Sequence, residues 1–469
     1  MIVAASVGVT SLHQIYYKPT TNLPRYEWNA AQDALRFYPC EKCWSRILHP
    51  LEYFCCTVYT GGALHFKGKL DQTRFIEALQ YTLKNFDFLF CRLHTDGGQV
   101  HASYSENSNN FVQLELEHNG SSSPLPEKID DRIRTGMVDD LEGLPMCALK
   151  VTTLHDGFTL GYRFNHALLD QASIFYFFKY LSIYYSDKTE TEYLAKPKLA
   201  DFDLLTAKNT PTFRDLEEFR AYGKSQGFQF LADKSELTTK ITTPFPGAIV
   251  DVHFKLSALS KLKAESECFI TENDLINALL LKIYAMDPSF LPNEEQHFSF
   301  PCNMRKKCGL DESVIGNLVY SCRLTLKTDY IRKATLIELA QINRKALNAV
   351  TPEAFKEWLM WYEGFTKFSQ NPKEYVLTNF IKPQHWTSSN WSSFNYQEIA
   401  FDHQQATTLT TPSASSLLAS LGMSVICFDT PRNEKTPNAV LGIPTASLKA
   451  IKEYGRLTGL YETTETHNN

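Results

Sequence analysis

The most informative stretch of the sequence is Phe158-Thr-Leu-Gly-Tyr-Arg-Phe-Asn-His166-Ala-Leu-Leu-Asp170. Its first seven residues alternate large apolar side chains with smaller or polar ones, which predicts a strand with one buried face. The apolar run Cys147–Leu154 precedes it, and the Asp156-Gly157 pair between the two runs favours a tight hairpin turn. An aromatic-rich helix is expected to follow over 172–185. His166 and Asp170 therefore occupy a short turn between a buried strand and a helix.

Similar mixtures of strand and helix lie on both sides of a long segment, 187–246, that has few periodic signals. Before this segment, 63–70 alternates like a strand and 71–85 has helical periodicity. After it, 250–254 alternates, and a capping-box pattern at Thr271 precedes another apolar helical run. The sequence predicts an α/β protein with an N-terminal domain over 1–186, a crossover over 187–246 and a C-terminal domain over 247–469.

Prolines interrupt residues 1–50, which we therefore expect to be irregular. With 469 residues, 43% of them hydrophobic, the chain is long enough and apolar enough to fold throughout. The net charge of −5 argues against nucleic acid or an anionic membrane as the main partner. No apolar run reaches the roughly 18 residues of a membrane span, and no secretory signal is recognisable. Eleven scattered cysteines suit a reducing compartment, so we expect a cytoplasmic protein. We also expect it to be a monomer.

His166 and Asp170 are the first candidates for chemistry. A neutral imidazole is a suitable general base for an alcohol or an amine, and strand ends hold such side chains on a rigid base. The spacing His-x-x-x-Asp is weak in itself, because a chain with 13 histidines matches it easily by chance. On the spacing alone, a histidine in a surface turn is the better interpretation.

Further segments, spread over 60–400, favour a catalytic role for His166 over a surface-turn histidine. Together with the strand–turn–helix block around His166, they occur in the order found in the BAHD acyl-CoA-dependent acyltransferases, and they are similar to the fungal members, such as the trichothecene O-acetyltransferases. The matching segments are Phe66–Phe75, Phe88–Leu93, Pro145–Val151, Val252–Phe254, Thr271–Tyr284, Phe300-Pro-Cys-Asn303-Met-Arg305, Ile315-Gly316-Asn317 and Ser389-Asn390-Trp391.

This resemblance implies two similar mixed-sheet domains with the active site in a channel between them. His166 would remove a proton from the hydroxyl or amine of a small molecule, in secondary metabolism, as that group attacks the thioester of an acyl-CoA, with acetyl-CoA favoured. Asp170 would pair with Arg305, supported by Asn303, and hold the histidine loop. Acyl-CoA would be a co-substrate, and the reaction would need no bound cofactor, no metal and no covalent acyl-enzyme.

Two further groups are assigned more loosely. The resemblance places Ser389, Asn390 and Trp391 on the acceptor side or near the oxyanion of the reaction. Coenzyme A carries several negative charges, so a protein of net charge −5 needs a local basic patch, and Lys306 and Lys307 are candidates for it. Adjacent cations are, however, more often a solvated turn.

The chain departs from the family pattern at two places, which leaves alternatives open. The family usually has glycine where this chain has Gln171, and its Asp-Phe-Gly-Trp-Gly motif is replaced by Ala400-Phe401-Asp402-His403-Gln404. These departures suggest an alternative, that the protein is a catalytically silent relative that binds a ligand. The intact His166, Asp170 and Arg305 argue against this alternative. A condensation-type enzyme would instead take its acyl group from a carrier protein. The single histidine at 166, without the double histidine of those enzymes, weighs against that alternative.

Overall fold

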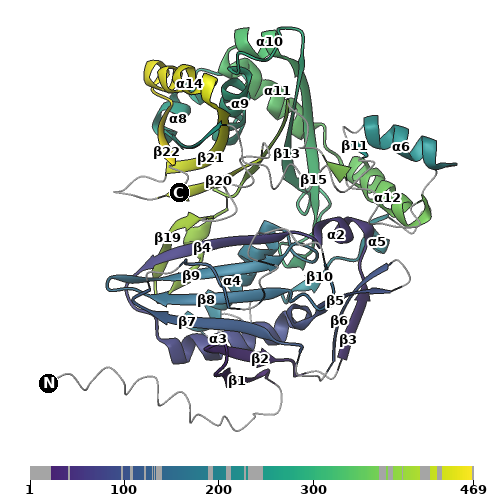
Figure 1. The fold of residues 1–469 in the computed structure, drawn as a ribbon, viewed down its shortest axis with the longest axis vertical. Helices are drawn as coiled ribbons and strands as arrows, with labels where there is room; N and C mark the ends of the chain where they lie inside the picture. Colours follow the sequence, from purple (N-terminus) through teal and green to yellow (C-terminus); the bar gives the residue numbers. More distant parts are fainter. Residues whose placement is uncertain are drawn as a thin grey trace.

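A computed structural model describes most of the chain between Leu23 and Thr466 (Figure 1). The segments inside this range that lie outside the described residues are 41–42, 97–98, 106–108, 121–122, 129, 131–132, 134–139, 188–193, 207–212, 226–228, 231–246, 369–376, 379–383, 393, 412–422 and 430–435. Much of the predicted crossover, 187–246, therefore lies outside the described residues, including its C-terminal end.

The N-terminal half is built on a mixed sheet that helices cover on one face (Figure 1). In sheet order its strands are β1 (Arg25–Asn29), β2 (Ala34–Tyr38), β7 (Val112–His118), β8 (Cys147–Thr153), β9 (Gly157–Asn165) and β4 (Tyr59–Lys67). The helices of this half are α2 (Pro50–Cys55), α3 (Gln72–Asn85) and α4 (Gln171–Ser186), and a smaller sheet contains β3 (Cys43–Ile47), β6 (Gln99–Ser105) and β5 (Arg92–Asp96).

The predicted hairpin and the helix after it are confirmed. β8 and β9 pair antiparallel, and the Leu154 N–H donates to the Gly157 carbonyl across the turn over 2.8 Å. Every residue of β9 is buried, because neighbouring strands flank it and the apolar side of α4 covers it. β9 and α4 therefore form a rigid frame on either side of residues 166–170.

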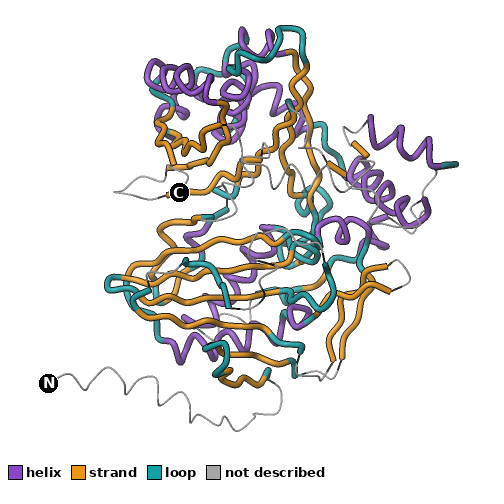
Figure 2. The backbone as a smooth tube through the Cα atoms, viewed as in Figure 1, coloured by secondary structure: helices purple, strands orange, loops and turns teal. Residues whose placement is uncertain are grey.

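The C-terminal half repeats this architecture, with helices gathered on the outer side of its sheet, as Figure 2 shows. The sheet order is β22 (Tyr461–Thr466), β12 (Gly247–Phe254), β21 (Thr436–Pro444), β20 (Met423–Asp429), β17 (His385–Asn390), β13 (Glu295–Asn303) and β15 (Val319–Lys327). Its helices are α8 (Leu256–Ala264), α9 (Glu272–Ala285), α10 (Thr328–Lys333), α11 (Leu336–Asn348), α12 (Pro352–Phe368) and α14 (Thr445–Thr458). The predicted capping box of α9 is present at Thr271 and Asp274.

Shorter elements connect these parts. They are η1 (Asp87–Phe90), β10 (Lys198–Leu199), α5 (Phe202–Thr206), α6 (Leu216–Ser225), β11 (Gln229–Phe230), β14 (Val314–Ile315), β16 (Leu377–Thr378) and η5 (Tyr396–Glu398). β10 pairs in parallel with β14, so part of the segment between the two halves lies beside the residues just before Gly316.

A late segment of the chain crosses from one half to the other. β18 (Ala400–Phe401) and β19 (Gln404–Thr410) form a hairpin, and β19 pairs antiparallel with β4 of the N-terminal sheet. Trp391, Tyr396 and Phe401 are buried in the same apolar cluster as β9 and α4. These residues thus extend the N-terminal half, although they belong to the segment 247–469 that the sequence analysis predicts as one domain.

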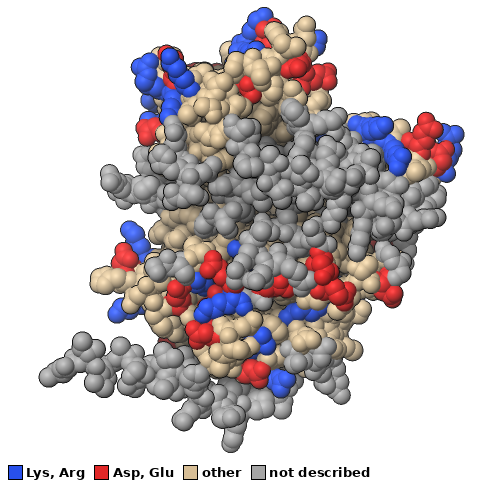
Figure 3. Space-filling model, in the orientation of Figure 1, with Lys and Arg blue, Asp and Glu red and all other residues tan. Residues whose placement is uncertain are grey.

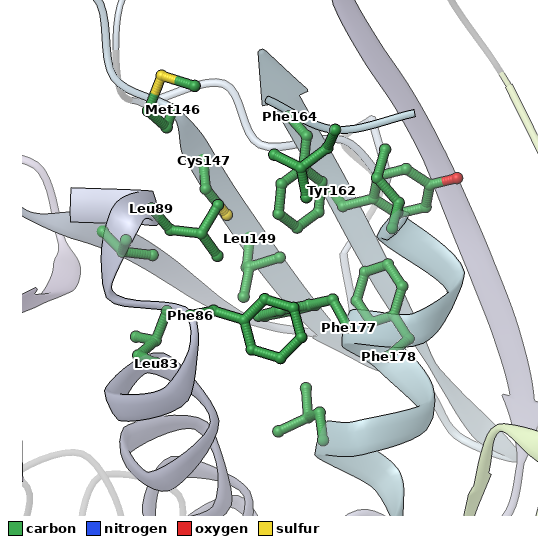
Figure 4. Close-up of a cluster of buried hydrophobic side chains, with 14 of the residues drawn as sticks. Leu83, Phe86, Leu89, Met146, Cys147, Leu149, Tyr162, Phe164, Phe177 and Phe178 are labelled. Carbon is green, nitrogen blue, oxygen red and sulfur yellow. The ribbon is translucent and has the colours of Figure 1, made fainter. Parts of the chain in front are cut away.

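The main core of the N-terminal half lies between its sheet and α3 and α4. Figure 4 shows Phe86 of the α3 end, Phe164 of β9 and Phe177 of α4 meeting there, with ring centroids 5.2 and 5.3 Å apart. The expectation that residues 1–50 are irregular is wrong for the described part, which contains β1, β2 and β3. The prolines at 24 and 39 flank these short strands and do not interrupt them.

Acidic and basic side chains are interspersed over the face that Figure 3 shows, in line with the small net charge. The eleven cysteines all lie within the described residues, and no disulfide joins them. Within the described residues, no helix is both long enough and apolar enough to cross a membrane.

Candidate active site

His166 lies in the five-residue turn between β9 and α4, and neighbouring backbone fixes this turn at its start. The His166 N–H donates to the Val58 carbonyl over 2.8 Å, just after α2. The Asn165 side chain donates to the Cys56 carbonyl over 2.9 Å and accepts from the Ala167 N–H over 2.9 Å. The backbone of His166 is therefore held independently of its side chain.

The imidazole of His166 is half-buried. Its Nδ1 atom is buried and has no hydrogen-bond partner among the residues that the structure describes. A buried polar nitrogen without a partner is uncommon and is often found where a ligand or a reacting group completes the contact. No hydrogen bond among the described residues therefore commits Nδ1 to a structural role.

Asp170 closes the turn as the N-cap of α4 and carries a buried ion pair. Arg305 reaches its two carboxylate oxygens from Nη1 and Nη2 over 2.7 and 3.0 Å, and both side chains are at most 5% exposed. The Ser173 N–H and hydroxyl each donate to Oδ1 over 2.8 Å, and the Leu318 N–H donates to Oδ2 over 3.2 Å. These donors occupy both oxygens of Asp170.

Burial alone would raise the pKa of the Asp170 carboxyl, but the Arg305 guanidinium and the Ser173 donors outweigh burial and hold this pKa below its ordinary value. Asp170 therefore stays ionised, and an ionised, fully hydrogen-bonded carboxylate is a poor proton carrier. Its geometry suits the positioning of the turn better than relay of a proton to His166.

The Arg305 guanidinium is saturated by contacts on both sides of the domain junction. Besides Asp170, its nitrogen atoms donate to the Asn303 side chain, the Val314 and Gly316 carbonyls and the Ser173 hydroxyl, over 3.2, 2.7, 3.1 and 2.8 Å respectively. The structure therefore brings four of the predicted residues, His166, Asp170, Asn303 and Arg305, into one connected arrangement.

Asn317 also belongs to this arrangement, although the sequence alone assigns it no role. Its amide donates to the carbonyls of His166 and Ala167, the latter over 2.6 Å, and its side chain is buried. Gly316 before it approaches so closely that a Cβ would lie 2.9 Å from that of Ala200. The Gly-Asn pair eleven residues after Arg305 is the sequence signal for this clamp.

Ser389, Asn390 and Trp391 lie at the end of β17. The Trp391 indole donates to the Ser389 hydroxyl over 3.0 Å, and the Asn390 amide donates to the Asn273 side chain at the start of α9 over 2.6 Å. No hydrogen bond among the described residues joins Ser389 or Trp391 to His166. Asn390 thus joins the segment to α9 of the C-terminal half, whereas Trp391 packs in the apolar cluster of the N-terminal half.

The two lysines after Arg305 differ in their environment. Lys307 Nζ donates to the Leu347 and Val350 carbonyls over 3.2 and 2.8 Å, so its charge neutralises the C-terminal end of α11. Lys306 is exposed. Of the two candidates for the coenzyme A side, only Lys306 has an ammonium group that is not already bound at a helix end.

The altered motif after Ile399 forms the turn between β18 and β19. Asp402 and His403 have positive φ angles of 50° and 66°, as the central residues of a type I′ hairpin turn do. Asp402 pairs with Arg74 of α3, and Phe401 packs on the rings of Phe66 and Phe75. The altered motif therefore still anchors the hairpin to the N-terminal half.

A family model, described as the Transferase family, matches residues 46–458. Solved structures with similar folds include TRI101 of F. sporotrichioides complexed with coenzyme A and T-2 (TM-score 0.64, 14% identity, 90% of this chain and 99% of that chain). TRI101 of F. graminearum with coenzyme A and T-2 mycotoxin has a TM-score of 0.66 at 12% identity, again over 90% and 99% of the chains.

Vinorine synthase follows with a TM-score of 0.59 at 14% identity, over 90% of this chain and 94% of that chain. No curated protein matches the sequence at a significant level. The structural neighbours share the two-half mixed-sheet fold, which confirms the predicted fold class. The family match covers most of the chain, including His166, Asp170 and Arg305, so the chain belongs to the Transferase family, the BAHD-type acyl-CoA-dependent acyltransferases.

Proposed function

We propose that this protein transfers an acyl group, with acetyl favoured, from acyl-CoA to a hydroxyl or an amine of a small molecule, and that His166 is the general base. The observation that carries the proposal is the His166 ring, whose Nδ1 has no partner among the described residues while its backbone N–H and carbonyl are both hydrogen-bonded. A general base needs a fixed position and a free nitrogen, and this residue has both.

The reaction proceeds in one enclosed complex of donor and acceptor. An imidazole nitrogen of His166 accepts the proton of the acceptor as its oxygen or nitrogen attacks the thioester carbonyl carbon. The carbon–sulfur bond then breaks, and the protonated imidazole returns the proton to the departing sulfur. The products are an ester or an amide and free coenzyme A, and no acyl group becomes attached to the protein.

The other residues have supporting roles. Asp170 and Arg305, with Asn303, hold the turn that carries His166, because their ion pair spans the junction of the two halves. Ser389, Asn390 and Trp391 lie on the acceptor or oxyanion side, where one good donor in other enzymes contributes about 3 kcal/mol. Lys306 is the better-placed candidate for the phosphates of coenzyme A, since Lys307 is bound to the end of α11.

The acceptor is proposed to be a secondary metabolite. The similar TRI101 structures contain the trichothecenes T-2 and deoxynivalenol, so these compounds belong in the first panel of acceptors. The test measures free-thiol release from acetyl-CoA with a panel of trichothecenes, simple alcohols and amines. Wild type is compared with His166→Ala and with His155→Ala, which removes an exposed histidine from the β8–β9 turn.

Turnover by wild type and by His155→Ala, with a loss of about 10²- to 10⁴-fold in His166→Ala, is the expected result. Equal rates in wild type and His166→Ala would refute the assigned base. Turnover only with an acyl group presented on a carrier protein would favour the condensation-type alternative. Coenzyme A binding without turnover of any donor would indicate a silent relative.

A further inference from the structure

One stripe of α4 contacts the segment that follows β17. Gln171, Phe175 and Lys179 are spaced four residues apart and so lie on one side of the helix. The Phe175 ring stacks on Phe394 with centroids 5.7 Å apart and meets Tyr396 edge-on at 5.4 Å. These contacts hold Phe394 and Tyr396 against the second turn of α4.

The third member of the stripe, Lys179, extends the contact at its far end. Its ammonium group pairs with Glu398 over 2.8 Å and with Glu312 of the C-terminal half over 2.9 Å. Both carboxylates are substantially exposed, so this end of the stripe contributes little free energy. The buried end, at Gln171, is therefore the more important one.

Gln171 joins three elements through one buried amide. Its Nε2 donates to the hydroxyls of Tyr162 in β9 and Tyr396 in η5, each over 3.2 Å, and the side chain is 8% exposed. Figure 4 shows the Tyr162 ring in the apolar core with its hydroxyl directed out of it. Burial raises the pKa of both phenols, so both hydroxyls stay neutral and keep the contact intact over the working pH range.

The contact between Gln171 and Tyr396 links the His166 turn to the Ser389–Trp391 segment. Gln171 follows Asp170 directly and lies five residues from His166. Tyr396 lies five residues after Trp391, whose N–H donates to the Ile426 carbonyl over 2.8 Å and whose indole holds Ser389.

We propose that Gln171 is a positioning residue of the acyl-transfer reaction, which sets the distance between the His166 turn and the Ser389–Trp391 segment by binding Tyr396. The inference rests on the proposed function, because the segment is taken to be the acceptor or oxyanion side. It also accounts for glutamine at a position where the resembled family has glycine, since glycine has no side chain to reach the phenol. Displacing a reacting group by about 1 Å costs up to 10²-fold in rate.

The experiment compares Gln171→Leu, Tyr396→Phe and the double variant with wild type. The substrates are acetyl-CoA and the best acceptor of the panel above. Leucine keeps the size of the glutamine side chain but has no hydrogen-bonding group. The matched control is Tyr461→Phe, which removes another buried tyrosine hydroxyl, bonded to the Ile451 carbonyl over 2.7 Å, in the outer part of the C-terminal half.

We expect kcat to fall about tenfold in each single variant, with KM for acetyl-CoA within about twofold of wild type, and to fall no further in the double variant. Tyr461→Phe should lower the melting temperature comparably and leave kcat unchanged. Unchanged kcat in Gln171→Leu, or losses that multiply in the double variant, would overturn the proposal. An equal fall of kcat in Tyr461→Phe would overturn it as well, since the loss would then follow stability.

Amide hydrogen exchange over residues 391–400 gives a readout that needs no turnover. Gln171→Leu should accelerate exchange in this segment, whereas Tyr461→Phe should leave it at the wild-type rate. Exchange that is identical in wild type and Gln171→Leu would show that the amide does not hold the segment. If wild type turns over no acceptor, the proposed function itself fails, and this outcome is distinct from a wild type that works alongside an equally active Gln171→Leu.

Discussion

Arg305 and Asp170 are 135 residues apart in the chain, and each is at most 5% exposed where they meet in a two-point ion pair. A single buried charge is costly, and the pair is stable only because each partner neutralises the other and the remaining hydrogen-bonding atoms are satisfied. The start of α4 therefore cannot move away from the loop after β13 without exposing or abandoning a charge. The position of His166 is tied to this constraint.

Replacing only one partner of this ion pair should lower the free energy of unfolding more than replacing both partners. We expect Arg305→Leu to lower the free energy of unfolding by about 3–5 kcal/mol, because it leaves the Asp170 carboxylate buried and unpaired. The double variant Asp170→Asn/Arg305→Leu should recover part of this loss. Urea unfolding followed by circular dichroism measures both. The exposed pair Lys333–Asp329 is the control, and Lys333→Met should cost at most about 0.5 kcal/mol.

Glu52 of α2 should make stability fall as pH rises. Burial raises the pKa of its carboxyl to about 7, against the opposing effects of Arg46 and the His49 N–H. Between the unfolded pKa of about 4.5 and the folded pKa of about 7, the folded state holds a proton that the unfolded state has lost. Stability should therefore decrease across this window, by up to about 3 kcal/mol, and level off above pH 7.

Glu52→Gln removes the titrating proton and keeps an acceptor for the His49 N–H, which donates to the native side chain over 2.8 Å. Its melting temperature should be nearly constant between pH 5 and 8, and above pH 7 it should exceed that of wild type. Thermal unfolding of both proteins in buffers of matched ionic strength measures this pH dependence of the melting temperature. A parallel pH dependence in both proteins would assign the effect to another group.

Local patterns predict the frame of the site well. The alternation in β9, the Asp-Gly turn before it and the aromatic run of α4 are all properties of neighbouring residues, and they place His166 at a strand end. The contact between Asp170 and Arg305 is predicted only through the resemblance. No local pattern links two positions 135 residues apart.

Other features of the site depend on contacts that no local pattern contains. Lys307 and Lys306 are indistinguishable as adjacent cations, and only the end of α11 beside Lys307 separates a helix cap from a free ammonium group. The sequence alone gives no reason for glutamine at 171, because its hydrogen-bond partner Tyr396 is 225 residues away in the chain. The crossing of β19 into the N-terminal sheet is likewise a long-range pairing with β4, which alternation alone cannot assign to either half.

Asn317 should be needed to hold the backbone of the His166 turn. Asn317→Ala removes the donors to the His166 and Ala167 carbonyls, and we expect a loss of about 1–3 kcal/mol in stability, since buried carbonyls lose their partner. kcat should fall at least tenfold while coenzyme A binding, measured by calorimetry, stays within about twofold. Asn317→Asp should be worse than Asn317→Ala, because a carboxylate would face two carbonyl oxygens. A more active Asn317→Asp would contradict the assigned geometry.

The β18–β19 turn should become more stable when His403 is replaced by glycine. His403 is exposed and has a φ of 66°, a left-handed conformation that costs a non-glycine residue about 1 kcal/mol. A type I′ turn favours glycine at this position after an aspartate such as Asp402. His403→Gly should therefore raise the free energy of unfolding by up to about 1 kcal/mol and leave kcat unchanged. Gln405→Gly, in the adjoining strand β19, should instead lower stability. A tenfold loss of kcat in His403→Gly would show that this imidazole takes part in the reaction.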